Sequence, residues 1–135
     1  MNQLKGTITG IQSHEGLSIV KVQGSNNCMF TSLVMDDMES AEWLQRGKQV
    51  ILYFKEIEVM ISKDADVRVS TQNRLPCKIK SMDTGVILCQ VELLFGETII
   101  TSIITANACK QLNLRENDLV TAFIKTNEIS VSPDD

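Results

Sequence analysis

The sequence is short of aromatic side chains and of basic clusters, and this shortage argues against nucleic-acid binding. Aromatic residues make up 4% of the 135 residues, and the net charge is −4. Proteins that bind nucleic acid without sequence preference need basic side chains for the phosphates and aromatic rings for the bases. The chain has neither a basic stripe nor a stacking platform, so we do not expect it to bind nucleic acid.

Metal-binding and catalytic motifs are also missing. The four cysteines form no C-x-x-C pair, and His14 is the only histidine, so no zinc site is predicted. We interpret the cysteines as small buried hydrophobic residues. No nucleophile–base set, paired-acid motif or phosphate-binding loop stands out, and we predict that the chain is not an enzyme. The cysteines are Cys28, Cys77, Cys89 and Cys109.

Long hydrophobic runs are absent as well. No stretch of roughly 18 apolar residues is present to form a transmembrane helix. The N-terminal segment MNQLKGTITG has no apolar core of the kind that secretory signals contain. We therefore expect a cytoplasmic protein that makes no contact with a membrane.

What the sequence does contain is an internal repeat. Two matching blocks lie 70 residues apart and a third pair lies 71 apart, in the same order. We therefore predict two domains, residues 1–64 and residues 70–135. The matching blocks are NQLKGTI (2–8) with NRLPCKI (73–79), FTSLV (30–34) with ITSII (100–104), and VILYFKEIEVMIS (50–62) with VTAFIKTNEISVS (120–132).

Each repeat reads mostly as strands, because runs of Val, Ile, Thr, Leu and Phe are bounded by Gly, Asn and Asp. One short helix is expected per repeat, at 106–113 and near 38–45. Five short strands and one helix in about 65 residues are typical of a small OB-like barrel. The predicted fold is all-β with one short helix per repeat, as two tandem OB-like barrels. The strands expected in the second repeat are 74–82, 86–94, 97–105, 119–125 and 128–132.

A late strand of each repeat is apolar on both faces, as in VILYFK (50–55) and VTAFIK (120–125). A domain of about 60 residues buries only about 60% of its unfolded surface and is marginal alone. We therefore expect the repeats to dock and the chain to form a homo-oligomer. Lys55 and Lys125 lie on the second face, either as rim lysines with buried stems or as ammonium groups that meet an anion.

Three blocks together resemble the Mop or molbindin domain, which is similar to the TOBE domains of transporter ATPases. They are STQN-L (70–75), TSIIT (101–105) and FIKTNEISV (123–131). The resemblance covers essentially the whole chain, twice, and is stronger in the second repeat. It implies an OB-like fold, homotrimers of tandem chains, and binding of molybdate or tungstate at interfaces between Mop domains. Molybdenum enters only as molybdate, and no organic cofactor is implied.

The family's ligand positions fall in the second repeat on Ser70, Gln72, Thr105 and Lys125. Gln72 stands where the family has arginine, and Ala108 stands where it commonly has serine. In the first repeat no residues correspond to the opening Ser-Ala-Arg, and Met35 and Met38 replace Thr105 and Ala108. The resemblance therefore implies a degenerate site in the first repeat.

Molybdate is a dianion without a proton to donate, so its best host offers only hydrogen-bond donors. The helix expected after Thr105 would add free N–H groups. For Thr101 and Ser102 the β-propensity of such side chains is the simpler explanation. The candidate oxyanion-binding residues are Ser70, Thr71, Gln72, Asn73, Thr105 and Lys125, with Thr101, Ser102, Thr31, Ser32 and Lys55 as secondary candidates.

Two functions remain open at this point. The first is a cytosolic oxyanion-binding protein that stores or buffers molybdate or tungstate. The second is a molybdate-responsive sensing or interaction module that acts through a partner protein, with weak or lost oxyanion binding. The degenerate first repeat motivates the second function, since a lost site leaves a surface free for protein contact.

Overall fold

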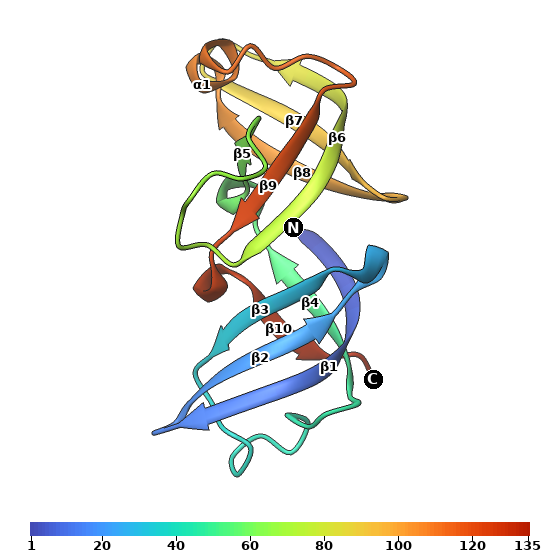
Figure 1. Cartoon of the computed structure of the whole chain (residues 1–135), viewed down its shortest axis with the longest axis vertical. Helices are drawn as coiled ribbons and strands as arrows, with labels where there is room; N and C mark the ends of the chain where they lie inside the picture. Colours follow the sequence, from blue (N-terminus) through green and yellow to red (C-terminus); the bar gives the residue numbers. More distant parts are fainter. The chain divides into compact units, whose positions relative to one another are not determined.

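The computed structural model describes residues 1–135 and divides into two compact units (Figure 1). Unit 1 consists of residues 1–54 and 125–135, and unit 2 consists of residues 55–124. Each unit contains one five-stranded, curled antiparallel sheet, which confirms the mostly-β, OB-like fold class. No helix of the chain has the length and apolar character needed to cross a membrane.

Unit 1 has the strand order β10-β4-β1-β2-β3. A two-residue turn joins β1 to β2, and its Glu15 and Gly16 both have positive φ angles of 50° and 79°, as a primed hairpin turn requires. The strands of unit 1 are β1 (Asn2–His14), β2 (Leu17–Gln23), β3 (Met29–Val34), β4 (Gln49–Phe54) and β10 (Ser130–Pro133), with 3₁₀ turns at Ser25–Asn27 and Thr126–Glu128.

Unit 2 has the strand order β5-β9-β6-β7-β8 and the one α-helix of the chain. Its strands are β5 (Met60–Ser62), β6 (Asn73–Thr84), β7 (Leu88–Phe95), β8 (Thr98–Thr105) and β9 (Leu119–Ile124), with α1 at Ala106–Gln111 and a 3₁₀ turn at Glu56–Glu58.

A long, bulged strand curls each sheet. In unit 2 the first half of β6 pairs with β9, and its second half pairs with β7. The register shifts between Ile79 and Ser81, and the matching shift in β1 lies between Ile8 and Gly10. An extra residue of this kind bends a strand and increases its twist, so each long strand can serve two neighbours.

The compact units do not coincide with the contiguous repeats at 1–64 and 70–135. Strand β5 follows β4 in the chain but pairs with β9, and β10 follows β9 but pairs with β4. Each repeat therefore gives its last strand to the unit built mainly from the other repeat. The sequence blocks are real repeats, but the boundaries of the folded units are set by this exchange.

The helix expected near 38–45 is not present, and this part of the prediction is wrong. Turns occupy the segment, and a single bond from Ala41 N to Asp37 O spans four residues at 3.0 Å. The side chain of Asp37 provides the reason. Its Oδ1 accepts from Glu39 N at 3.1 Å and from Ser40 N at 2.9 Å, which closes a tight local turn instead of a helix.

The cores are built from aliphatic side chains and two buried phenylalanines in each unit. Leu52 and Phe54 of β4 are buried in unit 1, and Ala122 and Ile124 of β9 are buried in unit 2. The opposite face of β9 is buried too, since Phe123 is 2% exposed. The apolar second face predicted for this strand is therefore covered within the single chain.

Candidate functional site

The segment that precedes β6 holds three of the six main candidate ligands. Ser70 and Gln72 are exposed, and Thr71 is half-buried. None of the three lies in a strand, because β6 begins only at Asn73. Their hydroxyl and amide groups can therefore reach a ligand from the end of unit 2 at which β6 starts.

Asn73 lies beneath this segment and serves the fold. Its side chain is 0% exposed, and its Nδ2 donates to Ile124 O at the end of β9, at 3.0 Å. The bond fastens the start of β6 to the last residue before Lys125. The buried amide thus positions its accessible neighbours.

Lys125 follows Ile124 directly, and it is exposed at the first position of unit 1 after the exchange. Lys55 is its repeat counterpart, also exposed, and its backbone N–H donates to Glu58 Oε1 at 2.9 Å. Neither ammonium group takes part in an ion pair of the chain. The three N–H donors of each ammonium group are therefore available to another partner.

Thr105 ends β8 and begins α1. Its Oγ1 accepts a hydrogen bond from Ala108 N at 3.0 Å, which is the bond of an N-cap residue. The hydroxyl proton is not used by this bond and remains available to an acceptor. The register pairs Thr105 with Leu88, beside the far end of β6.

Thr105 and the 70–73 segment therefore lie at opposite ends of unit 2. Figure 1 shows α1, which Thr105 begins, at the end of the unit away from the start of β6. One copy of unit 2 does not bring its own candidate ligands into a single cluster. The exposed residues near Asn73 and the threonine before α1 are two separate groups of candidate ligands.

The counterpart of Thr105 in the first repeat has a different chemistry. Met35 is 79% exposed and Met38 is 53% exposed, and neither side chain donates a hydrogen bond. Between them lies Asp37, whose pKa is lowered by the backbone N–H of Ser40. The lowered pKa favours the charged form of this carboxylate, and a carboxylate repels an oxyanion.

The secondary candidates that carry hydroxyl groups are buried or half-buried in the fold. Ser102 is 0% exposed, and its Oγ donates to Val59 O at 2.7 Å. Ser32, at the same position of the first repeat, donates to Ile129 O. Thr31 is buried beside it, and Thr101 is half-buried. Both serines hold the residue just before an exchanged strand.

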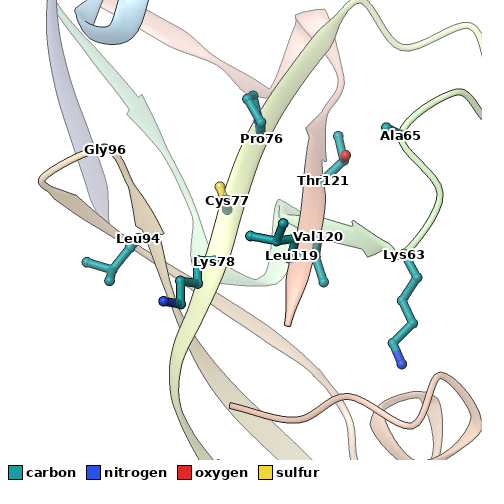
Figure 2. Close-up of a pocket in the computed structure, with 10 residues that line it drawn as sticks. All are labelled: Lys63, Ala65, Pro76, Cys77, Lys78, Leu94, Gly96, Leu119, Val120 and Thr121. Carbon is teal, nitrogen blue, oxygen red and sulfur yellow. The ribbon is translucent and has the colours of Figure 1, made fainter. Parts of the chain in front are cut away.

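A pocket of ≈ 510 Å³ opens on unit 2 between the segment after β5 and strands β6 and β9 (Figure 2). Lys63 and Lys78 belong to its lining, but their ammonium groups do not converge. The Nζ of Lys63 donates to Asn113 O at 2.9 Å and lies 3.5 Å from a carboxylate oxygen of Asp118. The pocket contains none of the candidate ligands and is not suited to a bare dianion.

Arg74 is the residue that sequence reasoning missed. It is a single basic residue in a strand, and nothing in its spacing marks it. In the structure its guanidinium group gathers the backbone of the segment that carries Ser70 and Gln72. A signal was available only in hindsight: the residue directly follows the buried Asn73.

The comparisons with known proteins point to one group. Residues 69–131 match the family model of the TOBE domain. No curated protein sequence matches the chain. The fold is similar to a structure of the cytoplasmic molybdate-binding protein ModG with molybdate bound, with a TM-score of 0.90 and 26% identity over 98% of this chain and 95% of that chain. A molybdate-binding protein from Sporomusa ovata matches with a TM-score of 0.43 and 25% identity over 44% of this chain and 88% of that chain.

Proposed function

We propose, from the match of residues 69–131 to the TOBE domain family, that the chain binds molybdate or tungstate as a free oxyanion. The observation that carries the proposal is the likeness to molybdate-bound ModG over nearly the full length of both chains. The role that fits is storage, buffering or homeostasis of the ion in the cytoplasm. The protein acts by binding, without catalysis and without an organic cofactor.

The accessible donors support this proposal. Ser70 and Gln72 are exposed, Lys125 has no carboxylate partner, and Thr105 keeps a free hydroxyl proton. A hydrogen bond to a charged group contributes roughly 1.5–3 kcal/mol. Micromolar affinity requires about 8 kcal/mol, so four or five such bonds are enough after the cost of immobilising the ion. Sulfate has the same charge and shape but is smaller, so size decides between the ions.

We propose that the site is completed by assembly, because the candidate donors of one chain lie far apart. The donors near Asn73 and the hydroxyl of Thr105 lie at opposite ends of unit 2. A site that uses both ends is completed only when another Mop-type domain supplies the missing end. We place the sites at interfaces between such domains of a homo-oligomer, with a trimer as the form that the resemblance implies.

Titration calorimetry on the intact protein tests the proposal. Molybdate and tungstate should each release or absorb heat with a saturable isotherm, and sulfate at the same concentration should bind much more weakly. Absence of any binding heat with molybdate and tungstate, supported by unchanged thermal melting in their presence, would overturn the assignment.

A second function is favoured by one observation. Met35 and Met38 expose flexible, polarizable side chains where the other repeat has its threonine, and such side chains suit a protein partner. In this alternative the chain is a sensing or interaction module that reports oxyanion levels to a partner protein. Affinity capture with and without molybdate tests it. If the wild type and a Met35→Ser, Met38→Ser variant captured a partner equally well, these methionines would have no role in binding it.

A further inference from the structure

The guanidinium group of Arg74 donates hydrogen bonds to the backbone carbonyl groups of the segment 65–71. Its Nη1 donates to Val67 O at 2.7 Å and to Ala65 O at 3.4 Å. Its Nη2 donates to Val69 O at 3.1 Å, and its Nε donates to Thr71 O at 3.3 Å. Four carbonyl groups at every second residue thus converge on one side chain. The segment from 65 to 71, drawn between β5 and β6 in Figure 1, is organised by Arg74.

The guanidinium group also packs against an aromatic ring. Its carbon lies 5.2 Å from the ring centroid of Phe123, a buried residue of β9. A cation over an aromatic face is attracted by the ring, and the planar fork is pre-organised for several carbonyls at once. A lysine offers one point charge on a flexible stem and does not reproduce this arrangement.

The charge of Arg74 is not neutralised by any carboxylate. All its partners are neutral carbonyls and a ring, and none of the ion pairs of the chain includes it. Asp64 and Asp66 of the same segment are exposed and form no ion pair with it. A positive field therefore remains beside Ser70 and Gln72.

The charge of Arg74 lies near Gln72, the position at which the Mop family has an arginine and this chain has a neutral residue. Gln72 is neutral, and the hydrogen bonds of Arg74 reach the residues on both sides of Ser70, at Val69 and Thr71. An anion held at this segment would meet a backbone that is already ordered and a nearby unpaired cation. Both reduce the free-energy cost of binding, the first through pre-organisation and the second through Coulomb attraction.

We propose that Arg74 is the positioning residue of the oxyanion site: it orders the 69–72 segment for ligand binding and supplies the positive charge that Gln72 lacks. The inference rests on the proposed function and deepens it. Arg74 acts through Ser70 and Gln72 without itself touching the ion, because four of its five N–H donors already bind carbonyl groups.

Three variants of the full chain distinguish the ordering of the 69–72 backbone from the positive charge of Arg74. Arg74→Gln removes the fork and the charge, Arg74→Lys keeps the charge only, and Arg68→Gln removes one exposed charge from the same segment as a matched control. Each is titrated with sodium molybdate at low and high salt, while hydrogen exchange follows the backbone of residues 63–72. Thermal melting reports whether each variant remains folded.

We expect Arg74→Gln to weaken molybdate binding at least tenfold and to speed hydrogen exchange in the segment. Arg68→Gln should bind within about twofold of wild type, which isolates the effect of Arg74 from net charge. Arg74→Lys should recover part of the affinity, with the recovered part lost at high salt, while exchange stays fast. If Arg74→Gln does not fold, the lysine variant alone must show the salt-dependent intermediate affinity.

The outcomes distinguish this inference from the proposed function. Wild-type affinity in a folded Arg74→Gln variant, with fast exchange in the segment, would reduce Arg74 to a structural residue and overturn the inference alone. No binding by the wild type would overturn the proposed function and this inference together.

Discussion

At the scale of single residues, one hydroxyl distinguishes the two repeats. Thr105 caps α1 through its bond from Ala108 N, whereas Met35 at the equivalent position has no group that could do so. The sequence showed that Thr105 stands at a strand end and does not recur, and this singled it out. It did not show that Asp37 would close a different turn in the first repeat, because an Asx turn and a helix start use the same residue types.

We predict that Thr105→Val lowers the free energy of unfolding by about 1 kcal/mol, the usual cost of losing an N-cap. Urea denaturation of the intact chain, followed by far-UV circular dichroism, measures this loss of stability. If Thr105 is also a ligand, molybdate affinity falls together with stability.

The matched variant is Thr105→Ser, which keeps the hydroxyl and should keep both properties. A valine variant that is as stable as the serine variant would show that the cap contributes nothing. A valine variant that loses stability but binds molybdate normally would remove Thr105 from the ligand set.

At the scale of elements, a pair of serines secures the exchanged strands. Ser102 donates to Val59 O one residue before β5, and Ser32 donates to Ile129 O one residue before β10. Their recurrence at a spacing of 70 is visible in the sequence, where β-propensity is the simpler explanation for Ser102 and both serines are only secondary ligand candidates. Periodicity placed them on a strand, but only the folded chain shows that their side chains point at a neighbouring backbone.

We predict that Ser32→Ala and Ser102→Ala each lower the free energy of unfolding by about 1–3 kcal/mol, because each leaves a buried carbonyl without its partner. The two positions are internal controls for one another, and their effects should be similar and additive. Denaturant unfolding with an unchanged m value measures them. Losses below a few tenths of a kcal/mol in both variants would contradict this role.

At the scale of the whole molecule, the strand exchange is the feature that the sequence could not predict. The repeats are alike, so β4 and β9 offer equivalent edges, and the patterns that describe β5 and β10 fit either edge. Strand number, fold class and the resemblance to tandem Mop-type proteins depend on local patterns, and these are confirmed by the fold and the TOBE match. The choice between two equal partners depends on chain connectivity, which no local pattern records.

The exchange predicts the behaviour of a single repeat. A fragment of residues 70–135 lacks β5, so β9 has an open edge, and it lacks β4, so β10 has no partner. Open edges recruit other strands. We expect the fragment to dimerise by trading β10 between two copies, as sedimentation velocity at several concentrations can measure. A fragment that stays monomeric throughout would show that β10 folds back onto its own β9.

The intact chain should combine assembly with ion binding. Native mass spectrometry in molybdate should report a homo-oligomer with bound ions, and Lys125→Ala should lose them, because one hydrogen bond from a cation contributes roughly 1.5–3 kcal/mol, or about 10- to 100-fold in affinity. Lys55→Ala is the matched control, since Lys55 is also exposed but belongs to the repeat whose threonine position is Met35. Equal ion loss in both variants would mean that both repeats bind. Retention of ions by Lys125→Ala would exclude Lys125 from the site.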